Sequence, residues 1–251
     1  NGANANEDVL VITPVADLTA GDGNVSPTEY FVADHDEIGA TFGITYSRAS
    51  NSVFAAAFAK RHTAFGPGGT GAIYKVDLNG DELTAPVSST GISTLVNLNT
   101  LFGANTAGAN PHPNTADFDR DPATYAVGKV GLGGLTMSET ENTLWTINLA
   151  DRRLYEIPLG GTFENPAPPA MADISRWPAT GDLTDLPGLV GADLETNIRP
   201  FGVKCYRGDI YVGMVYTAES TVIFNAATSV VSNLGDRTQM RGYIYKFDPD
   251  T

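Results

Sequence analysis

Three carboxylates alternate in the segment DFDRDP, where Asp117, Asp119 and Asp121 are separated by single residues. A turning loop can direct such alternate carboxylates at one hard cation, and Ca²⁺ prefers oxygen ligands of this kind. The segment departs from an EF-hand loop, because Pro122 occupies the sixth position and Gly128 the twelfth. The segment therefore predicts a calcium site of another kind, and the alternative interpretation is a solvated acidic turn.

A second alternation of oxygen ligands occurs in DLNGDE, with Asp77, Asn79 and Asp81. These residues directly follow an apolar segment, and a hairpin turn contains the same residue types for backbone reasons. The segment is thus a second candidate calcium site, with an ordinary turn as the alternative.

Acid/base chemistry is suggested by Asp34-His35-Asp36-Glu37, since a histidine among carboxylates can move protons or bind a metal ion. However, the chain has no HExxH spacing and no GxSxG segment, which argues against a metalloprotease and a serine hydrolase. The Gly-rich segment 65–71 lacks the Lys-Ser/Thr ending of a phosphate-binding loop. Lys60-Arg61-His62 and Arg199 can bind an anion or neutralise nearby carboxylates, and we favour neutralisation. We assign no catalytic residue.

The charge balance restricts the partners of the protein. The 251 residues include 15 Lys and Arg against 29 Asp and Glu, which gives a net charge of -14. A field of this sign repels phosphate backbones, so nucleic acid is not an expected partner. The sequence contains no run of about 18 apolar residues, so no membrane-spanning helix is predicted. Cys205 is the single cysteine, so no disulfide can form within the chain, and we expect a small buried side chain there.

The elements that position these residues recur along the chain. A glycine opens a short apolar strand, a polar turn and an aromatic strand follow, and a strand ending in Ile/Leu-Tyr-Lys/Glu-apolar closes the unit. The three copies run over Gly43–Leu78, Gly133–Leu159 and Gly202–Pro249. No apolar sequence follows the third closing strand before Thr251, so the third unit is expected to be unfinished.

Strand units without interleaved helical patterns predict an all-β fold. Val53–Ala59 has helical propensity, but its length and flanking turns favour a buried strand. We expect a β-propeller or part of one, with four-stranded blades and long inserted loops, and a β-sandwich is the alternative. Residues 1–251 are expected to form a single domain, with residues 1–8 as a linker or frayed terminus. Trp145, Tyr155, Tyr211, Tyr243 and Tyr245 are expected in the core between blades rather than in a sugar-binding platform.

The chain also resembles a known family over about Asp34 to Asp250. The segments that carry the resemblance are TFGITYSRASNSVFAAAFAKRHTAFGPGGTGAIYKVD, YAVGKVGLGGLTMSETENTLWTINLADRRLYEIPL, IRPFGVKCYRGDIYVGMV and RGYIYKFDP. They look like the propeller-like region of very large bacterial surface and secreted proteins, which often also carry SdrD B-like repeat domains. The resemblance implies an extracellular or cell-surface location and a chain that is a portion of a longer polypeptide.

Two functions remain open at this point. The first is a non-enzymatic propeller for adhesion, surface assembly or scaffolding, with bound Ca²⁺ and with surface proteins, matrix proteins or glycans as partners. The alternative is a calcium-dependent enzyme of the lactonase or sugar-dehydrogenase type, in which Asp34 and Glu37 polarise a carbonyl or activate water. The oligomeric state is left open.

Overall fold

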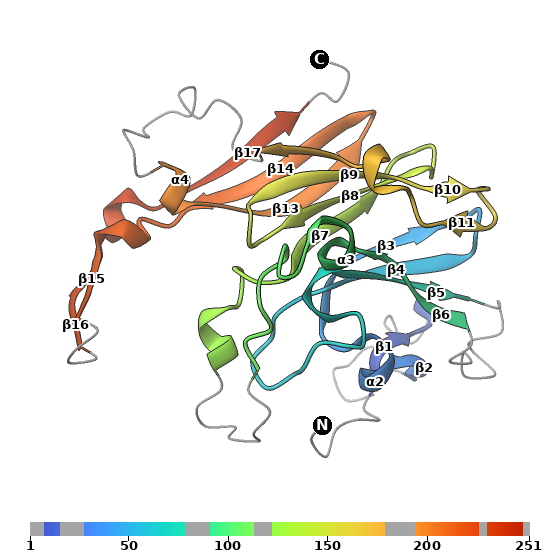
Figure 1. The fold of residues 1–251 in the computed structure, drawn as a ribbon, viewed down its shortest axis with the longest axis horizontal. Coiled ribbons are helices and arrows are strands. Elements are labelled where there is room, and N and C mark those ends of the chain that lie inside the picture. Colours follow the sequence, from blue (N-terminus) through green and yellow to red (C-terminus); the bar gives the residue numbers. More distant parts are fainter. Residues whose placement is uncertain are drawn as a thin grey trace.

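The computed structural model describes residues 8–15, 28–78, 91–112, 122–178, 194–225 and 230–247. The chain is all-β, with 52% of residues in strands and 16% in helices, and its sheets are antiparallel. The predicted fold class is therefore confirmed at this level. The described sheets do not close into a barrel or a propeller (Figure 1). Of the predicted linker, residues 1–7 lie outside the described part of the chain.

Three sheets follow one another along the chain, and each pairs its strands in chain order. The first sheet contains β3 (Thr41–Ser47), β4 (Ser52–Ala57), β5 (Ala72–Asp77) and β6 (Ile92–Asn97). The second contains β7 (Leu132–Met137), β8 (Thr143–Asn148), β9 (Arg153–Pro158) and β12 (Ser175–Pro178). The third contains β13 (Ile198–Tyr206), β14 (Asp209–Tyr216) and β17 (Arg241–Phe247). The three predicted repeats are thus three antiparallel sheets, and Val53–Ala59 forms β4 as predicted, up to Ala57.

Smaller elements surround the three sheets. A hairpin of β1 (Asp8–Ile12) and β2 (Tyr30–Asp34) precedes them, followed by α2 (His35–Ile38). A second hairpin of β15 (Val222–Asn225) and β16 (Val230–Leu234) extends away from the third sheet (Figure 1). The others are α3 (Leu98–Phe102), α4 (Leu194–Asn197), the pair β10 (Gly160–Gly161) and β11 (Pro166–Ala167), and the 3-10 segments η1 (Gly69–Gly71), η4 (Pro122–Tyr125), η5 (Met171–Asp173), η7 (Glu219–Thr221) and η8 (Arg237–Gln239).

The strand that opens each sheet, namely β3, β7 or β13, is called here its first strand. Every first strand has a bulge at a glycine where it pairs with the second strand. Phe42 and Gly43 lie opposite one residue of β4, Gly133 and Gly134 lie opposite one residue of β8, and Phe201 is the extra residue before Gly202. A bulge bends the strand and increases its twist, so the repeated glycine predicted from sequence marks a repeated bend.

Because glycine has no side chain, it also lets the backbones of neighbouring first strands come into direct contact. A Cβ atom on Gly43 would lie 2.4 Å from the Gly133 carbonyl oxygen, and one on Gly133 would lie 2.4 Å from the Phe201 carbonyl oxygen. A Cβ atom on Gly134 would lie 2.6 Å from the Val203 nitrogen. Between β13 and β7, the Cys205 N–H also donates a hydrogen bond to Thr136 Oγ1 at 3.2 Å. The three first strands therefore lie side by side, with β7 in the middle.

The apolar core lies in layers between successive sheets. The layer between the first and second sheets includes Phe54, Ile73, Leu135 and Tyr155, and the layer between the second and third includes Trp145, Leu154, Val212 and Met214. A third layer joins the β1–β2 hairpin to the first sheet. Trp145 and Tyr155 are buried as predicted, and Cys205 is also buried as predicted. Tyr243 packs against the core at the edge of its layer, but the prediction is wrong for Tyr245, which is 39% exposed although it lies on the same face of β17.

Replacing Gly43 with alanine should destabilise the protein by about 2 to 4 kcal/mol, because the new methyl group overlaps the backbone of β7. The matched control is Gly202→Ala at the equivalent bulge, where no described atom lies within 4 Å of the added Cβ. The control should change the free energy of unfolding by no more than about 0.5 kcal/mol. Urea denaturation at low protein concentration measures both values. Equal effects of the two substitutions would contradict the close approach of the first strands.

Candidate functional site

Most of the predicted calcium ligands lie outside the described residues. This holds for Asp117, Asp119 and Asp121, and also for Asn79 and Asp81. Asp77 is described at the end of β5, where its Oδ1 atom accepts a hydrogen bond from Ser52 Oγ at 2.7 Å and lies 2.5 Å from Lys75 Nζ. The Asp77 carboxylate is thus neutralised within its own sheet. In the described ranges, no group of three or more His, Cys, Asp and Glu side chains is placed to hold a metal ion.

The acidic segment Asp34–Glu37 forms the start of α2 rather than an open acid/base site. Asp34 Oδ1 accepts from the Glu37 N–H, and Glu37 Oε2 accepts from the Asp34 N–H, both at 3.0 Å. This capping box satisfies two backbone donors at the helix start. His35 Nε2 lies 3.2 Å from the Ala64 carbonyl oxygen. The carboxylates that the enzyme interpretation needs are therefore occupied by backbone donors.

A different pair of carboxylates connects the three sheets. The turn between β7 and β8 carries Glu139 and Glu141, and each reaches a neighbouring sheet. Glu141 Oε2 accepts from Ser47 Oγ at 2.7 Å and from the Ala49 N–H at 2.9 Å, in the first sheet. Glu139 Oε1 accepts from the Arg207 N–H at 2.6 Å, in the third sheet. The Ala49 backbone donor and the Ser47 hydroxyl lower the pKa of Glu141 below its usual value of 4.5.

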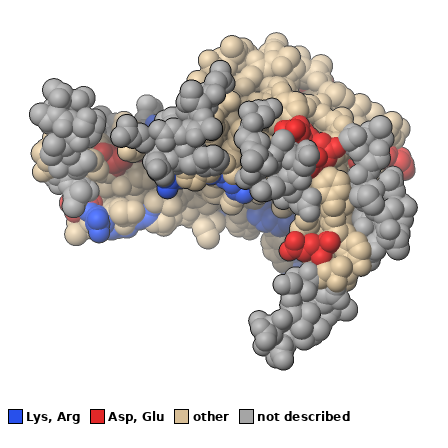
Figure 2. All heavy atoms as spheres, turned by 90° about the horizontal axis from the view of Figure 1, so that it is seen from below, with Lys and Arg blue, Asp and Glu red and all other residues tan. Residues whose placement is uncertain are grey.

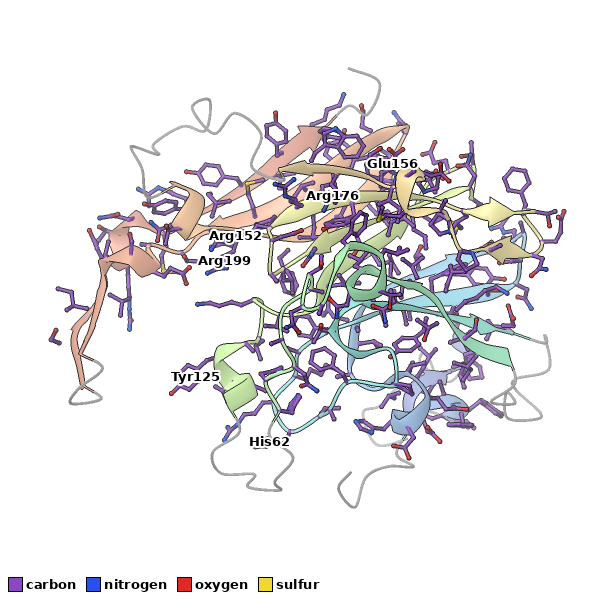
Figure 3. The ribbon with its side chains drawn as sticks, in the orientation of Figure 1. His62, Tyr125, Arg152, Glu156, Arg176 and Arg199 are labelled. Atoms are coloured by element: carbon purple, nitrogen blue, oxygen red, sulfur yellow. The ribbon has the colours of Figure 1, made fainter. Side chains whose placement is uncertain are left out.

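A connection made of ion pairs lies near the opposite end of the first strands. Glu219 in η7 binds Lys129 Nζ at 2.8 Å and Arg199 Nε at 3.1 Å. Burial, the largest single influence, raises the pKa of Glu219, but the two cations together outweigh it and hold the pKa below 4.5. Arg199 projects from the start of β13 (Figure 3). For Arg199 the prediction that it neutralises a nearby carboxylate is confirmed. On the surface seen from below, Lys and Arg are interspersed with separate Asp and Glu patches (Figure 2).

One further carboxylate has a shifted pKa that the sequence gave no reason to expect. Asp151, in the turn between β8 and β9, accepts from Tyr155 O–H at 2.5 Å and from the Arg153 N–H at 3.0 Å. Burial raises the pKa of Asp151, and the hydrogen bond from Tyr155 opposes the rise. Asn148 Nδ2 donates to the Thr106 carbonyl oxygen at 3.0 Å and lies 3.4 Å from the Tyr155 hydroxyl. This network ties the β8–β9 turn to the loop after α3.

Three phenylalanines meet beside the bulges of the first strands. The Phe42 ring centroid lies 4.8 Å from that of Phe201 and 5.3 Å from that of Phe58, while Phe58 and Phe201 are 5.7 Å apart. Phe42 and Phe201 come from the first and third sheets, so the two outer first strands approach each other around β7. Edge-on aromatic contacts of this kind stabilise the packing beyond the burial of area.

The face of the third sheet that points away from the second sheet is the largest departure from the repeat. Ile244 is 81% exposed, whereas the equivalent Ile73 and Leu154 are 0% and 1% exposed. Gly202, Gly213 and Gly242 lie on the same face, and a Cβ atom on any of them would contact no described atom within 4 Å. The side chain that is buried in two sheets is thus exposed in the third. An exposed apolar face of this kind is typical of an interaction site.

Comparison with known proteins identifies relatives but no family. No protein-family model matches the chain. The chain is 26% identical to colossin-D of Dictyostelium discoideum over 198 residues, 77% of this chain and 18% of colossin-D. It is 27% identical to colossin-C of the same organism over 189 residues, 75% of this chain and 16% of colossin-C. Colossin-A matches at 26% over 217 residues, 86% of this chain and 2% of colossin-A.

The chain therefore spans less than a fifth of the length of these relatives. They come from a eukaryote, so they lend no support to the bacterial origin that the family resemblance implies. Among solved structures, a luciferin-regenerating enzyme matches with a TM-score of 0.26 and 11% identity over 84% of this chain and 92% of that chain. A TM-score this low carries no argument about fold or activity. No helix in the described residues has the length and apolar character needed to cross a membrane.

Replacing Glu141 with glutamine should weaken the connection between the first and second sheets at neutral pH by about 1 kcal/mol, since the hydrogen bonds are exposed to solvent. The folded-state pKa of Glu141 is depressed, so its contribution is present above pH 4.5 and is lost as the pH falls through the folded-state pKa. The difference in unfolding free energy between the two proteins should thus shrink below pH 4.5. Urea denaturation from neutral to acidic pH measures it, and a difference independent of pH would contradict this role of the carboxylate.

Proposed function

We propose that this chain is a non-enzymatic module of an extracellular or cell-surface protein, acting in adhesion, surface assembly or scaffolding. Its fold is proposed to be part of a β-propeller, with the three sheets as successive blades. Side-by-side first strands, strand pairing in chain order and core layers between sheets support this fold over a two-sheet sandwich. The outer strands β6 and β12 complete two of the blades.

The observation that carries the functional proposal is the exposed face of the third sheet. Val215 and Ile244 on this face are exposed, and the flanking glycines leave open space beside them. Apolar faces rimmed by polar residues mark surfaces that bind other macromolecules. Lys204, on the rim of this face, is exposed, and Lys246 pairs with Asp209 at 2.9 Å. Surface proteins, matrix proteins and glycans are the proposed classes of partner.

The proposed location is supported by the resemblance of the repeated segments to the propeller-like region of large surface and secreted proteins. The proposal that the chain is a module of a longer polypeptide is supported by the small share of the colossins that it spans. The acidic net charge of -14 favours solubility and does not favour nucleic acid as a partner.

Calcium is proposed as a stabilising ion at Asp117, Asp119 and Asp121. The chemistry of three alternating carboxylates supports this segment. The alternative segment that begins at Asp77 is a poorer choice, because Lys75 already neutralises the Asp77 carboxylate.

Addition of Ca²⁺ to chelator-treated protein should raise its thermal midpoint, and the rise should be lost in the Asp119→Asn variant. The matched control is Asp81→Asn in the other segment, which should keep the response to calcium. Differential scanning calorimetry with Ca²⁺ and with Mg²⁺ measures the shift. A midpoint that does not respond to Ca²⁺ would remove calcium from the proposal without affecting the adhesive role.

The purified chain, added in excess to cells that display the parent protein, should compete for surface contacts and reduce attachment. The Ile244→Glu variant should compete less, because binding of a partner to this exposed face would then bury the charge of the glutamate. Phe163→Glu is the matched control, since Phe163 is also an exposed apolar residue but lies next to β10. Attachment counted under gentle flow measures the effect. Equal attachment with and without the chain would contradict the proposed function.

A further inference from the structure

The outer face of the third sheet is the face that points away from the second sheet. It is formed largely by β14 and β17, which are neighbours at one edge of the sheet (Figure 1). Side chains of a strand alternate between its two faces, and those of β14 that pack toward the second sheet begin at Ile210 and recur at every second residue. Gly213 therefore lies on the outer face, together with its partner Ile244. Val215 and its partner Gly242 lie there as well.

These last four residues form a square, in which projecting apolar side chains alternate with open spaces. Ile244 lies directly across from Gly213, and Gly242 lies directly across from Val215. Ile244 is 81% exposed and Val215 is 41% exposed. A Cβ atom on either glycine would contact no described atom within 4 Å. The two projecting side chains thus occupy one diagonal of the square, and the two hollows occupy the other.

A square of this kind is complementary to itself. Consider a second copy that faces the first across a two-fold axis running along the strands, midway between β14 and β17. The β17 strand of each copy then lies over β14 of the other. Each Ile244 lies over Gly213 of the other copy, and each Val215 lies over Gly242. All four side chains that project from the two squares therefore meet hollows.

We infer that the outer face of the third sheet binds the same face of a second copy of this chain, in a two-fold contact centred between β14 and β17. Contacts of this reciprocal kind are the commonest in soluble oligomers. Two sheets that pack face to face lie about 10 Å apart with their strands within about 30° of each other, which agrees with an axis along the strands. The inference names the partner for the proposed assembly role and rests on that proposal.

The charged residues of the face agree with this arrangement. Tyr211 and its partner Lys246 lie beside the square, and the axis places each Lys246 over Tyr211 of the other copy. An ammonium group over an aromatic ring is attracted to it. Lys246 Nζ also lies 2.9 Å from Asp209 Oδ2 in its own sheet, which offsets its charge. Lys204 lies on β13, on the side of β14 away from the axis, so the two copies of Lys204 stay apart.

The packing inside the chain favours a sheet as the occupant of this face. Ile73 of β5 and Leu154 of β9 are equivalent to Ile244, and each is buried against the next sheet. The first sheet offers no matching surface, because the β1–β2 hairpin already covers Ala55 and Tyr74 on its opposite face. The outer face of the third sheet is therefore matched by its own copy rather than by another described sheet.

Sedimentation velocity over about 1 to 100 µM tests the association. The unsubstituted chain is expected to pass from monomer to dimer and no further, because a two-fold contact closes on itself. Gly213→Val should weaken the dimer about 10-fold or more, since the added side chain fills the hollow that Ile244 needs. Ile244→Ala should also weaken it, because the hollow is then left empty. The variant with both substitutions should recover the dimer, since valine fills the space that isoleucine has left.

Controls separate a lost contact from a lost fold. Both positions are open to solvent in the single chain, so each variant should keep the urea midpoint of the unsubstituted chain. Gly202→Ala, on the same face but on β13 and outside the contact, should associate normally. A chain that stays monomeric throughout the range would overturn the inference. Normal association of Gly213→Val, or a combined variant no better than the single ones, would overturn the two-fold contact.

The same measurements distinguish this inference from the proposed function. A monomeric chain that still competes for cell attachment would refute self-association and keep the adhesive role. A chain that associates as described but has no effect on attachment would keep the contact and refute the adhesive role.

Discussion

The backbone contact between neighbouring first strands is the constraint on which the rest of the structure depends. Gly43, Gly133 and Gly134 bring main-chain atoms of successive sheets to distances that no side chain permits. The bulge at each of these positions bends the strand and increases its twist. Beside the first strands, the apolar layers between successive sheets contain large residues of the second strands, such as Phe54 of β4 and Trp145 of β8.

The most extensive contacts of each sheet are with its neighbours, and Phe42 and Phe201 add a contact between the first and third sheets. The stability of the stack is therefore close to a sum of similar interfaces. The closing motif does not have the same surroundings in every sheet. Tyr74 and Tyr155 are buried, and burial raises the pKa of Tyr74 to about 12, while the equivalent Tyr245 is exposed. A similar closing motif thus has different surroundings in different sheets, although Tyr245 lies on the face of β17 that packs toward the second sheet.

The repeat order, the strand positions and the turns could be predicted from the sequence, because they depend on local features. Alternating apolar residues, short polar turns and a repeated glycine suffice to place β4, β7, β8 and β9. The segment Leu95–Phe102 contains the end of a strand and a short helix, because Asn97 ends β6 and caps α3. The roles of the carboxylates could not be predicted, because Glu141 and its partner Ser47 are 94 residues apart. The exposed face of the third sheet could not be predicted either, because Ile244 has the same local pattern as the buried Ile73 and Leu154.

The carboxylates also explain why acidic composition is a weak guide to chemistry in this chain. Asp34 caps a helix, Asp77 pairs with Lys75, and Glu219 connects Lys129 with Arg199. Glu139 and Glu141 bind backbone donors of the sheets on either side of their turn. These interactions are directional, whereas burial of apolar side chains is not. Apolar layers supply most of the free energy that joins the sheets, and the carboxylates fix the position of one sheet against the next. A cluster of acidic residues in such a chain indicates a metal site only where no backbone donor or cation already occupies the oxygens.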